Sequence, residues 1–281
     1  MEILSFLAPP FAVCVVLVSV LGYLGLHVLL RGVIFVDLAL AQIVAMGAVI
    51  AFYLGYEYGT PQSFAISLAA AVLGAAVFSW TRMRHARVSQ EAIIGISYVV
   101  ASAATILVAD RAPEGAEHIK ELLAGTVIWV TWPTVSHVLK ICATVGVVYY
   151  LLRRKFHLIS ENPELAFDSG MRVRWWDFLF YVLFGLVITV SVEIAGVLMV
   201  FAYLVAPAII ALVFSDRWSV RIALAWLTGL LASAMGLLAS YRWDLPSGPA
   251  IVCCLGLFLL VFAGWRRLRK SHSSSTTTAV P

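Results

Sequence analysis

The chain has 281 residues, of which 62% are hydrophobic and only 12% charged, and its formal net charge is +4. Its mean hydropathy of +0.98 excludes an ordinary soluble domain, and so small a positive charge does not indicate nucleic-acid binding. Apolar runs of about 20 residues recur along the chain, as in proteins with several membrane spans. Because these runs are rich in Leu, Ala and Gly and must satisfy their backbone hydrogen bonds in lipid, they predict an all-α polytopic membrane bundle.

We predict about nine transmembrane helices, taken in chain order. They are Ala8–Leu30, Gly32–Leu54, Ser63–Thr81, Ala92–Ala109, Val135–Leu152, Trp176–Val190, Gly196–Val213, Val220–Ala239 and Ala250–Trp265. Together they make one transmembrane domain over residues 1–270. The polar, low-complexity residues 271–281 are expected to be a disordered cytoplasmic tail.

Basic residues lie in alternate loops of this arrangement. They are Arg82, Arg84 and Arg87; Arg153, Arg154, Lys155, Arg172 and Arg174; Arg217 and Arg221; and Arg266, Arg267, Arg269 and Lys270. Loops rich in Lys and Arg favour the cytoplasm. The N-terminus is therefore predicted outside and the C-terminus inside, and the acidic segment from Asp110 to Glu121 falls outside.

The second predicted span contains two polar residues, Asp37 and Gln42. A carboxylate is costly in lipid, so Asp37 is expected to face a cavity or a partner, or else to make a structural link to Arg31 or to the backbone. Gln42 either lines a pathway or bonds a neighbouring helix. Five residues on a helix turn by about 140°, so the two side chains do not converge on one ion.

Other ionisable residues have two possible roles each. Glu193, in TVSVEIAG between the sixth and seventh spans, either lies on a pathway or extends to the outer interface beside a tight turn or broken helix. His27 is either a packed hydrogen-bonding residue or a ligand. Glu91 suits the first turn of its helix. The outer segment EGAEHIKELLAG can put Glu114, Glu117, His118 and Glu121 on one helical side, as a solvated face or as an attractor of cations.

The cytoplasmic loop over about 155–175 is longer and more patterned than a linker requires. It contains ISENPELAFDSGMRVRWWDF, which predicts a short amphipathic helix capped by Ser160 or Asn162, with Pro163 in its first turn and Gly170 at its end. Such a helix is either a connector resting on the membrane or a docking helix for a soluble partner.

This loop and five other motifs resemble the permease subunits of ABC-type zinc, manganese and iron importers, the ABC-3 family. The motifs, in chain order, are GYLGLHVLLRGVIFVDLALAQ, EAIIGISY, ELLAGTVIWVTW, NPELAFDSGMRVRWWD, IAGVLMVFAYLVAPAIIALVFSDRW and DLPSGPAIV. The resemblance covers most of the chain. It implies that Pro163, Glu164, Leu165, Ala166 and Gly170 couple the chain to an ATP-binding subunit.

The second span departs from the family pattern, in which an Asp lies four residues before a His. Leu38 and Gln42 occupy these two positions, and Asp37 lies one residue early. Gln is a weaker ligand of transition metals than His. The family's metal pair therefore does not carry over, and Asp37, Gln42 and Glu193 are retained as candidate pathway residues for a metal ion.

The resemblance implies a multi-pass permease in the inner (plasma) membrane of a prokaryote. It implies a homodimer, two ATP-binding subunits, and an extracytoplasmic solute-binding protein that delivers a zinc, manganese or iron ion. The chain contains no G-x-x-x-x-G-K-[ST] motif, so we expect no cofactor and no enzymatic activity of its own, with ATP bound by the partner.

The alternatives are a permease of the same family for another substrate such as a metal chelate, a stand-alone secondary transporter, and an intramembrane enzyme, for which no convergent catalytic residues are found.

Overall fold

The structure is a computed structural model, and it describes all residues except 1, 58, 83–87, 111–124, 126 and 276–281. The described residues form helices and connections without strands, which confirms the all-α prediction. The helices are α1 (Glu2–Leu30), α2 (Val36–Tyr53), α3 (Pro61–Trp80), α4 (Gln90–Ala109), α6 (Trp132–Glu161), α7 (Pro163–Asp168), α8 (Val173–Phe214), α9 (Trp218–Trp243) and α10 (Ser247–Ser275), with a 3-10 turn at Val127–Trp129.

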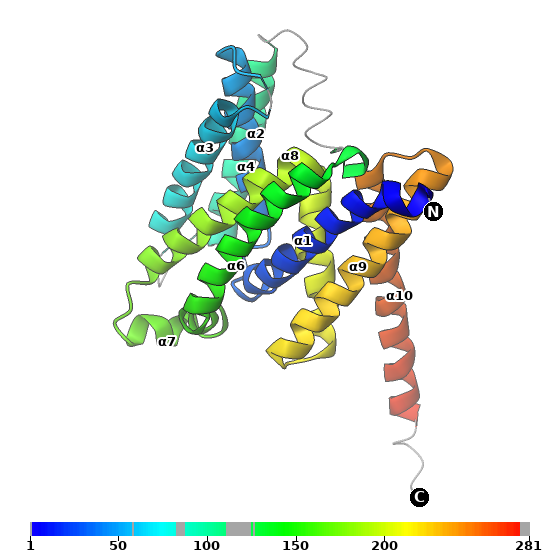
Figure 1. Ribbon diagram of the computed structural model, residues 1–281. Helices are drawn as coiled ribbons and strands as arrows, with labels where there is room; N and C mark the ends of the chain where they lie inside the picture. The colour runs from blue at the N-terminus through cyan, green and yellow to red at the C-terminus, as the bar shows by residue number, and fades with distance from the viewer. Residues whose placement is uncertain (1, 58, 83–87, 111–124, 126, 276–281) are drawn as a thin grey trace, which may run out of the picture.

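Eight of the described helices are long and apolar enough to cross a membrane, and one of them, α8, contains two of the predicted spans. As a straight helix of 42 residues, α8 would be about 63 Å long, roughly twice the thickness of the hydrocarbon layer. Its helical geometry is interrupted at Gly196, which has φ 74° and ψ 160°, and Figure 1 shows the chain reversing its direction there. The fold thus provides the nine crossings expected, and the sixth and seventh are joined by a tight turn.

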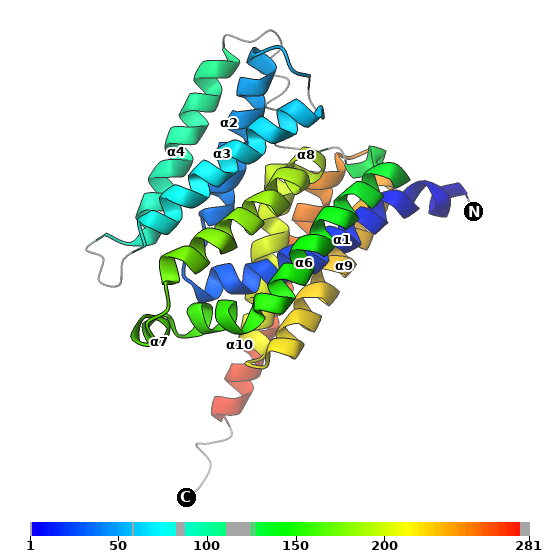
Figure 2. The same cartoon turned by 60° about the vertical axis from the view of Figure 1, so that its left-hand side comes forward.

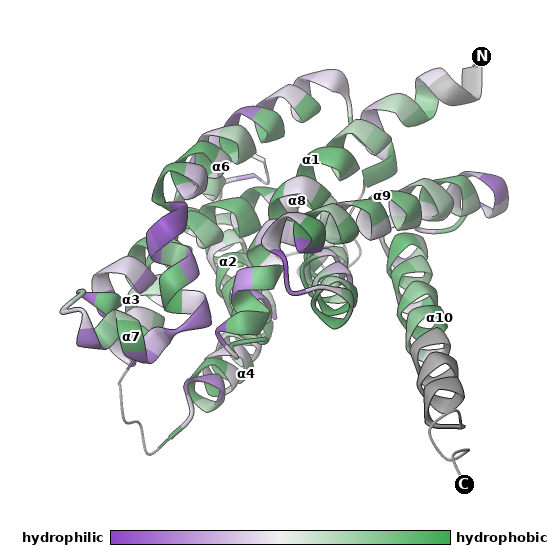
Figure 3. Cartoon of the chain, turned by 90° about the horizontal axis from the view of Figure 1, so that it is seen from below, coloured by the Kyte–Doolittle hydropathy of each residue, from purple (hydrophilic) through white to green (hydrophobic). Residues whose placement is uncertain are grey.

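The nine crossings alternate in direction, so the two termini leave the bundle at opposite ends. The connection that contains α7 and Arg172, and the connection between α8 and α9, which contains Arg217, lie at the end where α10 leaves the bundle (Figure 1). Figure 3, viewed from this end, shows hydrophilic residues around α7 and the neighbouring end of α6, and hydrophobic residues along the helices. This arrangement agrees with the pattern of basic loops, while the orientation in the membrane stays a prediction.

The centre of the bundle is α8, which packs against α1, α2, α3, α6, α9 and α10. Its side chains Phe180, Phe184 and Tyr203 are fully buried, and so are Leu21 and Leu24 of α1. By contrast, α4 packs mainly on α2, and Figure 2 shows α2, α3 and α4 as a group beside the other helices. Movements of α8 therefore reach nearly every other helix directly.

The turn at Gly196 is packed against a second glycine that is distant in the sequence. Gly125 has φ 68°, and a Cβ atom there would overlap the backbone of Ala195 and Gly196. Both glycines belong to motifs quoted above, ELLAGT and IAGV. The backbone contact explains why glycine is needed at both positions, since an L side chain is strained at these dihedral angles.

The helix α10 is assigned through Ser275, so it extends into the segment for which a disordered tail was expected. Residues 276–281 lie outside the described part of the chain.

Replacing Gly125 by alanine should destabilise the fold. The positive φ alone costs an L residue about 1–2 kcal/mol, and the Cβ would also collide with backbone atoms that cannot move aside easily. We expect Gly125→Ala to lower the free energy of unfolding in mixed detergent–SDS micelles by about 2 kcal/mol or more. Gly95→Ala is the matched control, because the helical Gly95 has open space around it; an equal loss in both variants would contradict the packing argument.

Candidate functional site

The predicted cytoplasmic helix is present as α7, Pro163–Asp168. Pro163 is its first residue, and Gly170 follows with φ 72°, as the sequence indicated. Asn162 occupies the N-cap position but its side chain makes no capping hydrogen bond. Ser160 is not a cap for α7: it belongs to the last turn of α6 and is buried, so that alternative is wrong.

The two sides of α7 differ in exposure. Ala166 is fully buried and packs with Ile159 and Val173. Glu164 and Gly170 are exposed, and Leu165 is 58% exposed although it is a large apolar side chain. Of the five predicted coupling residues, Ala166 therefore anchors the helix, while Glu164, Leu165 and Gly170 are accessible to a partner.

A buried arginine ties both flanks of α7 to the end of α1. Arg31 donates from Nε to Ser160 Oγ at 2.9 Å and from Nη1 to Asp177 Oδ1 at 2.6 Å. Ser160 ends α6 just before α7, and Asp177 lies in the first turns of α8 just after it. The Arg31 and Asp177 side chains have no exposed surface. We call Arg31, Ser160 and Asp177 the α7 clamp.

Three further groups complete the environment of the α7 clamp. The Arg31 guanidinium lies 3.8 Å from the centre of the Phe180 ring, a favourable cation–π arrangement. The other carboxylate oxygen of Asp177 is 3.3 Å from Arg82 Nε, which brings the segment after α3 to the same point. His27 Nδ1 shares a hydrogen bond of 2.8 Å with Ser160 Oγ; His27 is thus a packed hydrogen-bonding residue.

Within the described residues Arg31 pairs with Asp177 and not with Asp37, so the structural link from Asp37 to Arg31 is wrong. The Asp37 side chain is buried in the first turn of α2, and neither carboxylate oxygen has a hydrogen-bond partner among the described residues. The nearby Glu91, in the first turn of α4, instead accepts hydrogen bonds from the backbone N–H groups of Ile34 and Phe35 at 3.0 and 3.1 Å. Glu91 therefore joins the start of α4 to the entry of α2.

The three candidate pathway residues do not meet at one point. Asp37 lies at the α7 end of α2, Gln42 is half-buried further along this helix, and Glu193 is exposed near the opposite end, beside the Gly196 turn. Glu193 borders a cavity of about 20 Å³ with Ser63, Ser67 and Thr189. Within the described residues, no three His, Cys, Asp or Glu side chains are grouped to hold a metal ion. Glu114, Glu117, His118 and Glu121 lie outside the described residues.

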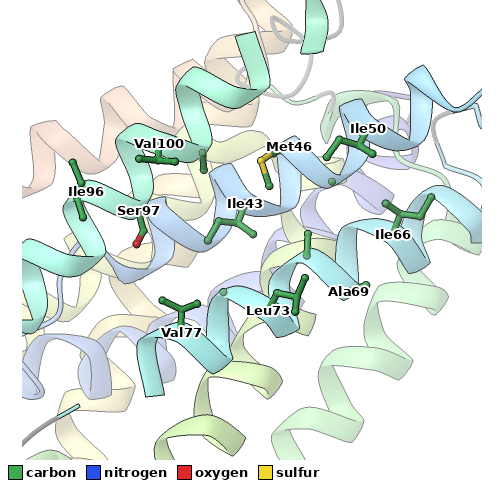
Figure 4. A pocket seen from close by; sticks show the side chains of 14 residues that line it. Ile43, Met46, Ile50, Ile66, Ala69, Leu73, Val77, Ile96, Ser97 and Val100 are labelled. Atoms are coloured by element: carbon green, nitrogen blue, oxygen red, sulfur yellow. The ribbon is translucent and has the colours of Figure 1, made fainter. Parts of the chain in front are cut away.

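A larger groove runs between α2, α3 and α4 (Figure 4). It has a volume of about 560 Å³ and is lined by apolar side chains such as Ile43, Met46 and Leu73. Its one hydroxyl side chain, Ser97, already donates to the Ile93 carbonyl at 2.8 Å. The groove offers no ligand for a cation, so it is not an ion site.

Sequence reasoning missed Asp177 and the role of Arg31. Both residues stood in quoted motifs, but nothing local connects positions 31 and 177. The available signal was that two charges of opposite sign lie at the ends of apolar runs predicted on the same side of the membrane, where a buried charge needs a partner.

Removing the charge of Asp177 should be strongly destabilising. Asp177→Asn keeps the shape of the side chain but leaves the buried Arg31 without its counter-ion; breaking a buried pair in this way costs about 3–5 kcal/mol. SDS unfolding of the purified chain measures the loss. The control is Asp216→Asn, since Asp216 pairs with Arg221 at 3.0 Å but is fully exposed, so little change is expected there. Similar stabilities for Asp177→Asn and the unmodified chain would contradict the α7 clamp.

Proteins similar to the chain are membrane components of metal transport systems. The manganese transport system membrane protein MntC of Halalkalibacterium halodurans is 25% identical over 284 residues, covering 97% of this chain and 95% of the relative. The chelated iron transport system membrane protein YfeD of Yersinia pestis is 27% identical over 244 residues, covering 86% of this chain and 79% of the relative.

A solved structure has the same fold, and a family match spans nearly the whole chain. The structure, PsaBC from Streptococcus pneumoniae in complex with Fab, superposes with a TM-score of 0.76 at 23% identity, covering 92% of this chain and 90% of the other. The model of the ABC 3 transport family matches residues 4–265. The chain belongs to the ABC 3 transport family.

Proposed function

We propose that the chain is the membrane-spanning permease subunit of an ABC importer for a divalent transition metal: zinc, manganese or iron. The observation that carries this proposal is the family match over residues 4–265. Relatives named for manganese transport and for chelated iron transport support a metal cargo. ATP hydrolysis belongs to a separate subunit, because the chain has no phosphate-binding motif of its own.

The exposed side of α7 is the proposed docking surface for that ATP-binding subunit. An apolar Leu165 beside Glu164 at the basic end of the bundle is suited to contact with a soluble protein. This assignment puts α7 in the cytoplasm and the N-terminus outside, in agreement with the basic loops.

In the proposed mechanism, the α7 clamp carries the movement of α7 into the membrane. Because Arg31 holds the residues on both sides of α7, a displacement of α7 moves the ends of α1, α6 and α8 together. Two copies of the chain form the pore, and an external solute-binding protein delivers the cargo near the Gly196 turn and Glu193. ATP-driven closure of the nucleotide subunits then alternates access between the two sides.

A second candidate cargo is a metal chelate. Leu38 and Gln42 stand where the family pattern has Asp and His, and the described residues contain no cluster of three metal-ligating side chains. A chelate supplies its own ligands to the metal, so its permease needs no tight ion site. The alternative of a stand-alone secondary transporter leaves the exposed side of α7 without a role.

Transport should depend on ATP and on the exposed side of α7. Vesicles that contain the chain with its ATP-binding subunit and solute-binding protein are supplied from outside with free Zn²⁺, Mn²⁺ or Fe²⁺, or with chelated iron, with and without ATP. We expect ATP-dependent uptake of one cargo and a loss of about tenfold in Glu164→Ala or Leu165→Ala, the size typical of an interface hot spot. Asp216→Ala is the control, because Asp216 is an exposed acid at the same end of the bundle but outside α7.

The other outcomes separate the alternatives. An uptake rate that is the same with and without ATP contradicts the importer and favours a secondary transporter. Uptake of the chelate alone, with the ATPase active, selects the second candidate cargo. Uptake that is unchanged in the α7 variants contradicts the docking role of α7.

A further inference from the structure

A second large cavity lies at the basic end of the bundle, and none of the pathway candidates lines it. It has a volume of about 620 Å³ and is enclosed by α1, α6 and α9. Its walls combine apolar and aromatic side chains, among them Val20, Tyr23 and Trp226, with the guanidinium groups of Arg153 and Arg154. Unlike the groove in Figure 4, it therefore offers positive charge beside an apolar surface.

The two arginines lie at the depth of lipid headgroups. The helix α6 begins at Trp132 and runs for 30 residues to Glu161, and about 20 helical residues cross the hydrocarbon layer. Arg153 and Arg154 follow at the far end of that stretch, on the side of the bundle where α7 lies. The part of the cavity further from α7, near Val20 and Gly146, is at the depth of the acyl chains.

The charges at this cavity are free to bind an anion. Arg153 and Arg154 are exposed, and neither makes an ion pair within the part of the chain that the structure describes. Arg153 lies 4.3 Å from the centre of the Tyr150 ring, which holds the guanidinium at the cavity edge.

Aromatic side chains line the same cavity. The rings of His157 and Trp218 are stacked at 4.0 Å with an angle of 7° between them, and Trp226 donates from Nε1 to the Ser19 carbonyl at 3.0 Å. Tryptophan side chains with an apolar body and a bonded N–H are typical of the membrane interface.

We propose that this cavity binds an anionic phospholipid from the leaflet on the α7 side. Its phosphodiester lies between Arg153 and Arg154, and an acyl chain lies along Val20 and Ile222. Basic pockets between transmembrane helices at the cytoplasmic side have the chemistry that recognises such headgroups. A soluble phosphate could satisfy the arginines but not the apolar walls, so the lipid is the occupant that matches both parts of the cavity.

Native mass spectrometry of the full chain in detergent tests the site with phosphatidylglycerol and phosphatidylcholine as probes. We expect the unmodified chain to retain phosphatidylglycerol in preference to phosphatidylcholine, and Arg153→Gln or Arg154→Gln to reduce this preference about fivefold each, as expected for one basic contact. Lys155→Gln should leave it unchanged. Lys155 is the matched control because it is the adjacent cation on α6, but its Nζ lies 4.1 Å from the centre of the Trp176 ring and not in the cavity.

A second measurement uses tryptophan quenching. Brominated phosphatidylglycerol should quench the fluorescence of the unmodified chain more than that of Trp218→Phe, while glycerol phosphate and inorganic phosphate should not displace the lipid. Equal retention of the two lipids would overturn the proposal in favour of unselective lipid contact, and an equal loss in Lys155→Gln would overturn it in favour of a diffuse surface charge. Displacement by inorganic phosphate would overturn it in favour of a site for a soluble anion.

Discussion

The buried pair of Arg31 and Asp177 is the interaction on which the arrangement at the α7 end depends. Two charges with no solvent contact are tolerated only when each is compensated by the other and by the groups around it. Ser160 supplies an acceptor for Arg31, Phe180 covers its guanidinium, and Arg82 approaches Asp177 from the segment after α3. One electrostatic requirement thus fixes the relative positions of four segments that are distant in the sequence.

The opposite end of the bundle is fixed by backbone packing and not by charge. Gly125 and Gly196 allow two main-chain segments to approach more closely than any side chain permits. Because α8 contains Asp177 near its start and reverses at Gly196, this central helix connects the charged end to the packed turn beside Glu193. A direct link between the α7 end and the opposite end of the bundle is therefore built into a single stretch of chain.

The sequence predicted those features that depend on local chemistry. The apolar runs gave the nine crossings, since their length matches the membrane, and Asn162, Pro163 and Gly170 indicated a short helix at α7. Interactions between residues that are distant in the sequence could not be predicted in this way. The partner of Arg31 is 146 positions away. Nothing near Asp37 in the sequence indicated that the backbone N–H groups just before α2 would bond to Glu91 of α4 and not to Asp37. Among the described residues, the carboxylate oxygens of the buried Asp37 have no hydrogen-bond partner, which no local pattern can predict.

The most direct test of this account is whether α7 and the end of α1 move as one body. Spin labels at Ser169 and Ile34, both exposed, report their separation by pulsed electron resonance in the complex with the ATP-binding subunit. The account predicts the same mean and width of the distance distribution with and without ATP, and a broader distribution in Asp177→Asn. A distance that changes with ATP in the unmodified chain would contradict it, because the α7 clamp would then not hold through the transport cycle.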